Sequence, residues 1–226
     1  FNYADIYQTP VFVISDKYLL EGHQSVDKEI LSEYKFKIER GKLLTQGDLD
    51  KNLPYNRYAD AADGISPRAI PGMKHAVFQA NSYEHAFDGH TSEEALDRVT
   101  QVDKRAKKIK TFLANHVKLP VLYGNKDAKH TLVIWGSTKG PALQAMKGFE
   151  SLFNVLHFSY MWPLPEKELS DILKSIPSPI LVENNSTGQL GQLLKMVTGV
   201  HIKHSLLKYN GRPIYPEEIL EKVHSL

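Results

Sequence analysis

The strongest constraint on the fold is the regular alternation of short apolar runs with helical segments that follows Pro120. The connections between these segments are short, which favours right-handed strand–helix–strand units and a mostly parallel sheet with helices on both faces. Gly199 follows one predicted helix where a left-handed cap belongs, and Pro216 stands at the first turn of another. The pattern predicts strands at 131–135, 154–158, 179–183 and 202–207, and helices at 141–152, 165–175, 187–198 and 216–224.

The first half of the chain is less regular. A short amphipathic segment at 1–7 leads into the apolar run 11–14, which predicts a helix followed by a buried strand, and we expect the sequence to begin inside a domain. Residues 41–90 are rich in Gly, Pro, Asp and Asn and predict long irregular connections with one short hairpin near 76–80. The spacing of Thr91 and Glu94 then predicts a capping box that opens a helix of about six turns, with apolar positions from Leu96 to Leu113.

Composition excludes several classes of function. The net charge of +2 and the lack of a basic stripe exclude nucleic-acid binding, and the basic run 104–108 is interpreted as a solvated helix face. No window reaches about 18 consecutive apolar residues, so no membrane span is predicted and a cytoplasmic protein is expected. With no cysteine, the chain can form neither a disulfide nor an iron–sulfur cluster of its own.

Two strand-to-helix corners are candidate sites. Parallel strands place such corners at the carboxyl edge of the sheet, where ligands and partner subunits are met. In the first corner Ser137 and Thr138 offer hydroxyls, and Lys139 brings a cation to a helix N-terminus that favours anions such as phosphate. The alternative is a plain tight turn, since the sequence is not that of a P-loop. In the second corner the Asn and Ser residues at 184–186 would cap the helix in any event, and Glu183, Asn184 and Gln189 are candidates for an interface or a ligand.

Two stretches of the irregular region carry further candidates. Arg68 lies in a loop stiffened by prolines on both sides and suits a carboxylate or phosphate, although an interdomain ion pair is the commoner use. Four potential metal or acid–base groups follow within seven residues, namely Glu84, His85, Asp88 and His90. We interpret these side chains as ordering their loop rather than binding a metal, because their spacing in the sequence does not guarantee that they converge in space. No Ser–His–Asp order or nucleophile elbow supports a hydrolase.

In their order along nearly the whole chain, six motifs resemble the α subunit of 2-oxoacid:ferredoxin oxidoreductases, a family similar in plan to the pyruvate:ferredoxin oxidoreductases. The motifs lie at Ser15–Leu19, Asp63–Gly72, Tyr83–His90, Trp135–Gly140, Glu183–Leu190 and Tyr209–Pro213. The resemblance implies a transketolase C-terminal-like domain at 116–226, an irregular connection with a bridging helix at 31–115, and the end of a pyrimidine-binding-like domain at 1–30.

The resemblance also implies an enzyme that decarboxylates a 2-oxoacid with thiamine diphosphate and magnesium, reduces ferredoxin through a [4Fe-4S] cluster, and hands the acyl group to coenzyme A. A β subunit would hold the diphosphate and the cluster. The family's Tyr-Pro-Ile-Thr-Pro and Gly-Pro-Ser-Thr-Gly motifs do not occur here, so we expect the chain alone to bind none of these cofactors and to be inactive. At the first corner, Ser137, Thr138 and Lys139 are candidates for contact with a coenzyme A phosphate. The alternative function for the whole chain is that of a non-catalytic flavodoxin-like module that binds a nucleotide or a protein.

Overall fold

The computed structural model describes all 226 residues and divides into two compact units. The first consists of Phe1–Val13 with Ser25–His116, and the second of Ile14–Gln24 with Val117–Leu226. The chain therefore passes from the first unit into the second and back before entering the second for good. No helix combines the length and the apolar character that a membrane crossing requires.

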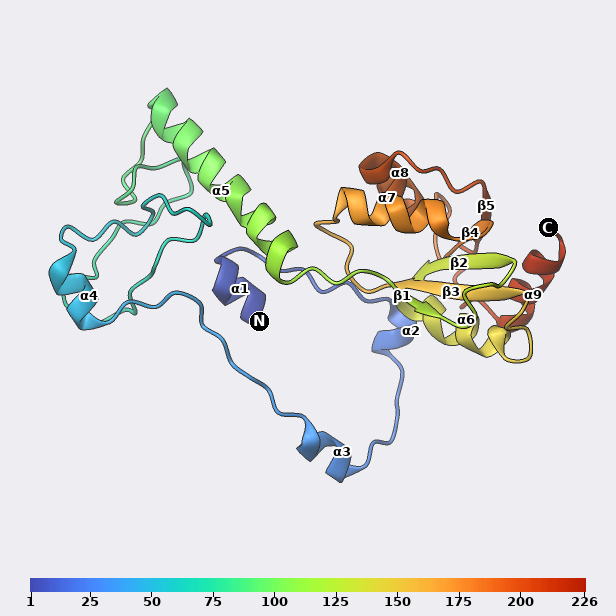
Figure 1. Ribbon diagram of the computed structural model, residues 1–226. Coiled ribbons are helices and arrows are strands. Elements are labelled where there is room, and N and C mark those ends of the chain that lie inside the picture. The colour runs from blue at the N-terminus through green and yellow to red at the C-terminus, as the bar shows by residue number, and fades with distance from the viewer. The chain divides into compact units, whose positions relative to one another are not determined.

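The second unit is built on one five-stranded sheet in the order β1-β3-β2-β4-β5 (Figure 1). Four strands are parallel, and β1 pairs antiparallel with β3 at one edge. The strands are β1 Val121–Tyr123, β2 His130–Trp135, β3 Phe153–Phe158, β4 Pro179–Glu183 and β5 His204–Leu207. Because β3 lies on one side of β2 and β4 on the other, the winding of the sheet reverses between β2 and β4.

Helices cover both faces of this sheet. On one face α6 (Lys139–Met146) packs with α9 (Pro216–His224), and on the other α7 (Glu166–Ser175) packs with α8 (Gln189–Thr198) (Figure 1). Alternate residues of the central strands serve the two cores, as the two-residue period of a strand requires. Leu132 and Ile134 belong to the core under α6 and α9, while Val133 belongs to the core under α7 and α8.

The predicted fold class is confirmed, and every strand and helix predicted after Pro120 is present. One helix is shorter than predicted, because the chain turns at Lys147 and Gly148 takes a φ of 81°, which ends α6 at Met146 instead of residue 152. Strand β1 was not predicted, since three residues are too few to show a period of their own.

The first unit has little regular structure beyond one long helix, α5 (Ala95–Asn115). Three short helices accompany it, and a fourth, α2, belongs to the second unit. They are α1 Asn2–Tyr7, α3 Lys28–Glu33, α4 Gln46–Lys51 and α2 Lys17–Leu20. The irregular character predicted for 41–90 is confirmed except for α4, which a capping box between Thr45 and Asp48 opens.

Several predictions for this half are wrong. Residues 11–14 form no strand and are exposed, because apolar content without a pairing partner does not make a strand. Residues 76–80 form no hairpin. The predicted capping box is replaced by Ser92, whose hydroxyl donates to Asp97 (2.6 Å) and accepts from the backbone of Glu94 (3.2 Å).

The predicted burial pattern of α5 is also wrong. Its buried residues are the polar Gln101 and Lys104, whereas Leu96 and Val99 of the apolar stripe are more than half exposed. The basic run 104–108 is therefore not simply a solvated face. Lys104 is 4% exposed and is held by backbone carbonyls, which a helical period cannot reveal.

Candidate functional site

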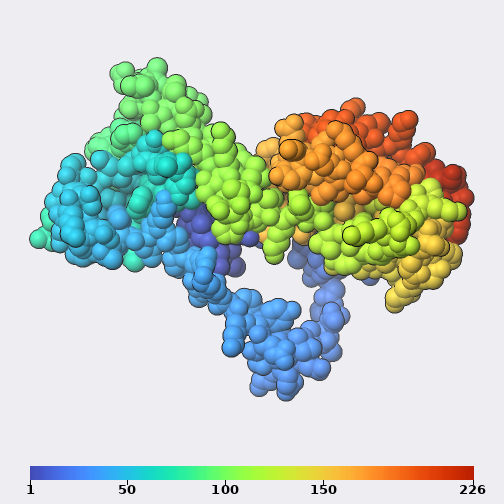
Figure 2. All heavy atoms as spheres, viewed as in Figure 1, coloured from blue at the N-terminus to red at the C-terminus, as the bar shows by residue number.

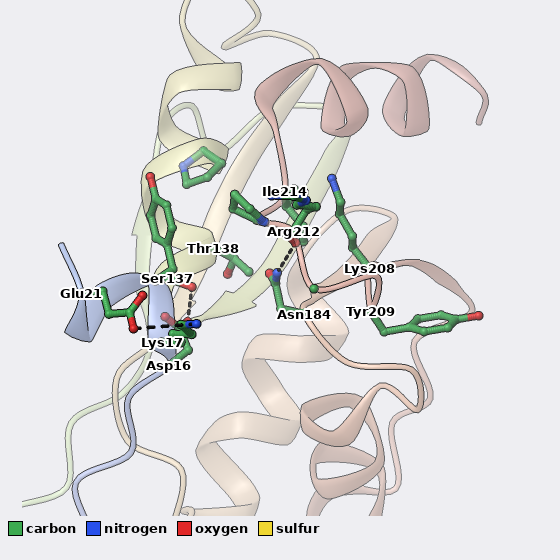
Figure 3. Close-up of a pocket in the computed structure, with 14 residues that line it drawn as sticks. Asp16, Lys17, Glu21, Ser137, Thr138, Asn184, Lys208, Tyr209, Arg212 and Ile214 are labelled. Atoms are coloured by element: carbon green, nitrogen blue, oxygen red, sulfur yellow. Dashed lines mark hydrogen bonds and ion pairs between the residues drawn. The ribbon is translucent and has the colours of Figure 1, made fainter.

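A cavity of about 530 Å³ lies in the second unit next to the point where the winding of the sheet reverses (Figure 3). The loops after β2 and β4 diverge there, which is where open α/β sheets form their ligand crevices. Helix α2 and the loop after β5 complete the lining. The polar and charged residues that line the cavity are Asp16, Lys17, Tyr18, Glu21, Ser137, Thr138, Asn184, Lys208, Tyr209 and Arg212.

The first corner is already engaged by side chains of the same unit. Ser137 Oγ donates a hydrogen bond to Asp16, whose other carboxylate oxygen accepts from the backbone N–H of Leu19 (2.9 Å) and so caps α2. Thr138 Oγ1 donates to the carbonyl of Trp135 (2.7 Å). The two hydroxyls therefore fix the loop and α2, and the Asp16 carboxylate places a negative charge on this side of the cavity.

Lys139 begins α6 but does not line the cavity. Its Nζ lies 4.8 Å from the centre of the Tyr123 ring, a cation–π contact at the β1 edge of the sheet. It makes no ion pair. Burial and the Lys139 charge together lower the pKa of His157, a β3 residue opposite Val121 whose ring centre lies 6.4 Å from that of Tyr123. The structure thus separates Lys139 from the cavity, although it leaves the charge without a carboxylate.

In the second corner Glu183 is fully buried and accepts four hydrogen bonds. Its Oε2 accepts from the indole of Trp135 (3.1 Å), the amide of Asn185 (2.6 Å) and the backbone N–H of Leu190 (3.1 Å), while Oε1 accepts from the N–H of Gly191 (3.2 Å). The N–H groups of Leu190 and Gly191 lie in the first turn of α8 and have no acceptor within the helix, and a carboxylate is favoured at this position. Glu183 consequently anchors α8 to β2 and β4.

Asn184 and Gln189 do not share this buried position. Asn184 is exposed, lines the cavity, and its amide donates to the Arg212 carbonyl at 3.4 Å (Figure 3). Gln189 is exposed at the start of α8. Asn185 is one of the Asn and Ser residues that the sequence offers for capping this helix. Its Oδ1 accepts from the backbone of Thr187 (3.1 Å), Gly188 (2.7 Å) and Gln189 (3.3 Å), in a turn that leads into α8.

The cavity holds three cations that sequence reasoning also missed. Lys208 is bound through both oxygens of Glu218 at 2.7 Å, which holds the pKa of that carboxyl below its usual range. Lys17 lies a loose 3.8 Å from Glu21, with both side chains largely exposed. Arg212 makes no ion pair. The available signals were the first and last resemblance motifs, which contain Lys17 and Arg212 but gave these residues no role.

The remaining candidates lie in the first unit, apart from this cavity. The Arg68 guanidinium donates to Asp5 (3.0 Å) and to the Arg40 carbonyl (3.0 Å), and its buried Nε has no partner. The ion pair expected for Arg68 therefore exists within one unit, rather than between domains. Glu84 accepts two hydrogen bonds from Arg105 (2.7 and 3.0 Å), which lowers its pKa.

The other three candidates of this stretch make polar contacts within their own loop. His85 Nδ1 lies 3.0 Å from the Ala86 carbonyl, Asp88 accepts from the backbone of His90 (3.0 Å), and the Asp88 carboxylate lies 3.0 Å from the His90 ring. These contacts agree with the interpretation that the side chains order the loop. Nowhere in the chain do three or more His, Asp or Glu side chains cluster as metal ligands would.

No protein-family profile matches the chain. The chain is 32% identical over 223 residues to the α subunit of 2-oxoacid:ferredoxin oxidoreductase 1 of Sulfurisphaera tokodaii, and 35% identical over 229 residues to the α subunit of 2-oxoacid:ferredoxin oxidoreductase 2 of Aeropyrum pernix. Each match covers 97% of this chain and 34% of the relative, so the chain spans about a third of the length of these relatives.

A solved structure agrees with the sequence matches. The 2-oxoglutarate:ferredoxin oxidoreductase of Magnetococcus marinus, determined with 2-oxoglutarate, coenzyme A and succinyl-CoA bound, superposes with a TM-score of 0.73 at 26% identity. The superposition covers 84% of this chain and 33% of that chain. Similarity therefore extends over both units and is not limited to the α/β sheet.

Proposed function

Because this chain belongs to the family of 2-oxoacid:ferredoxin oxidoreductase α subunits, we propose that it works as part of an enzyme that oxidatively decarboxylates a 2-oxoacid to an acyl-CoA and reduces ferredoxin. The observation that carries the proposal is the match of 97% of the chain to α subunits at 32–35% identity. Relatives of one kind along both units favour this function over a flavodoxin-like binding module, which would account only for the second unit.

The donor set of the chain decides which cofactors it can hold. A [4Fe-4S] cluster does not fit, because the chain has no cysteine and offers no cluster of alternative ligands. In the proposed enzyme the cluster, the thiamine diphosphate and its magnesium ion would belong to a β subunit. This chain would then act as a scaffold, with its sheet and the anchored corner at Glu183 as the rigid part.

The surface of the chain supports a partner subunit. Large apolar side chains are exposed along an extended stretch, among them Phe12 (87%), Val13 (92%) and Phe36 (85%). The stretch continues through residues 26–38, a segment drawn in blue in Figure 2, where further large apolar side chains are exposed. Exposed apolar surface of this extent marks an interaction site in a folded protein. We assign it to contact with the remainder of the enzyme, including the β subunit.

Purification of the tagged chain from its source cells tests this function. The expected result is an assembly that contains a cysteine-rich second polypeptide, thiamine diphosphate and iron, with ferredoxin as the electron acceptor. A chain that elutes alone, or with a partner that lacks thiamine diphosphate and iron, would contradict it. The recombinant chain by itself is the control, and it should show neither cluster absorption nor 2-oxoacid-dependent reduction of a viologen.

The first corner is a proposed contact for a phosphate of coenzyme A. Support comes from the charge of Lys139, which no carboxylate neutralises, and from its place in the first turn of α6, where backbone N–H groups favour an anion. Ser137 and Thr138 would contribute by holding the loop in place, since both hydroxyls already have partners. Arg212 in the neighbouring cavity is a second cation without an ion pair.

Kinetics of the assembled enzyme test this contact. Lys139→Ala should raise the apparent constant for coenzyme A by about five- to thirtyfold, as expected for the loss of about 1–2 kcal/mol from one partly exposed contact. Lys147→Ala is the matched control, because Lys147 is an exposed lysine without a partner at the other end of α6. Weakened subunit assembly with unchanged coenzyme A kinetics would instead assign Lys139 to the interface.

A further inference from the structure

A second cavity, in the first unit, is surrounded by positive charge. It measures about 180 Å³ and lies between α5 and the loops of the irregular region. Arg57, Lys104, Arg105 and Lys108 line it, together with His85, and no carboxylate does. Arg105 is neutralised by Glu84, so three cations face the cavity without a counter-ion.

Lys104 is the most buried of the three. Its Nζ donates to the carbonyls of Tyr58 (2.6 Å) and Ala59 (3.3 Å) and to the hydroxyl of Ser66 (2.9 Å), all of them neutral acceptors. Hydrogen bonds to neutral groups position an ammonium but do not cancel its charge. Asp60, whose charge raises the pKa of Lys104, is itself bound through both oxygens to Lys107 at 2.9 Å.

The other two cations also lack a carboxylate partner. Arg57 makes no hydrogen bond or ion pair and lies over the rings of Tyr58 (5.1 Å) and Phe78 (5.8 Å). Lys108 is half-buried and donates only to the carbonyl of Gln8 (3.0 Å). Both arrangements fix the direction of a cation while leaving it free to attract an anion.

The cations also repel one another. Burial, followed by the charges of Lys108, Arg57 and Arg105, lowers the pKa of Lys104 to about 8 against the opposing effect of Asp60. The pKa of Lys108 is lowered by burial and then by Arg57 and Arg105. A cluster of like charges that faces a cavity is stabilised when an anion enters. A single monovalent anion would compensate only one of three charges.

We propose that this cavity binds a multivalent oxyanion, a phosphate or sulfate group, through Arg57, Lys104 and Lys108. The volume admits one tetrahedral oxyanion with a few further atoms, so the group is either a free ion or the end of a phosphate ester. The site lies in a different unit from the cavity beside the sheet and does not depend on the function proposed above.

Titration calorimetry with the full chain tests the site. Sodium sulfate is the first probe, because it stays divalent across the pH range, and sodium acetate at equal ionic strength is the monovalent control. Sulfate should bind to one site, whereas acetate should not. Affinity should fall at least about fivefold between about pH 7 and about pH 9.5, as Lys104 loses its proton. No binding of sulfate, or binding independent of pH, would overturn the proposal without the need for any variant.

Two variants and one control locate the binding. Arg57→Gln and Lys108→Gln should each weaken sulfate binding by about fivefold or more, whereas Lys110→Gln, which removes an exposed charge from the same helix, should change it by less than about twofold. Equal losses in all three would show a general charge effect and refute the site. Inorganic phosphate and glycerol phosphate then separate the two sources, since tighter binding of the ester indicates a phosphorylated ligand.

Discussion

Replacing Glu183 by glutamine should weaken the second unit far more than the loss of one charge on the surface would. The carboxylate accepts four hydrogen bonds from four donors while fully buried. A glutamine carbonyl can serve about two of these donors, and its NH₂ group would face the others. Two donors are therefore left unpaired, each at about 1–3 kcal/mol, and the favourable interaction with the N-terminus of α8 is lost. Relief of the buried charge offsets part of this, which leaves an expected loss of about 2–4 kcal/mol.

Urea unfolding followed by tryptophan fluorescence measures this change directly, because both tryptophans, Trp135 and Trp162, belong to the second unit and one of them donates to Glu183. The midpoint should move to lower urea with an unchanged slope. Glu221→Gln on α9 is the matched control, since Glu221 is exposed and its side chain has no partner, and it should shift stability by less than about 0.5 kcal/mol. If Glu183→Gln were as mild as this control, the proposed anchoring of α8 would be refuted.

Two further changes test the charges described above. A lysine with a lowered pKa binds fewer protons in the folded than in the unfolded protein, so the free energy of unfolding should rise by up to about 3 kcal/mol between about pH 8 and pH 10.5 through Lys104 alone. Chemical unfolding of the protein and of Lys104→Met at both pH values should show this rise in the first and not in the second. An equal rise in both would show that burial does not lower the pKa of Lys104. Glu218 has a lowered pKa, so its contribution is present above about pH 4.5 and lost as the pH falls; Glu218→Gln should cost about 0.5–1 kcal/mol at neutral pH, because the carboxylate is partly exposed, while Glu217→Gln should be nearly neutral in thermal unfolding.

The α/β unit was predictable because each of its elements has a local signal. Gly199 takes a φ of 73° as the cap of α8, and Pro216 occupies the first turn of α9, as the sequence indicated. Apolar runs such as 179–183 became strands because neighbours of the same kind were available to pair with them. The run at 11–14 is also apolar but has no strand to pair with, so local content alone gave a wrong prediction.

The candidate sites were predictable only in part. The two corners lie where parallel topology places them, yet their residues act differently from one another, since Glu183 is buried and Lys139 turns toward Tyr123. The burial of Lys104 depends on carbonyls more than 40 residues away in sequence. No period or motif encodes such long-range contacts between a helix and irregular loops. The sequence therefore did not predict the basic cavity, and the basic run 104–108 was interpreted as a solvated helix face.

The central claim is tested most directly by assaying the assembly purified from source cells through this chain for 2-oxoacid-dependent reduction of a viologen. We expect reduction that requires both a 2-oxoacid and coenzyme A, that yields an acyl-CoA, and that is absent from the recombinant chain alone. An assembly that retains this chain and its partners in stoichiometric amounts, yet reduces no acceptor with any of pyruvate, 2-oxoglutarate or a branched-chain 2-oxoacid, would contradict it.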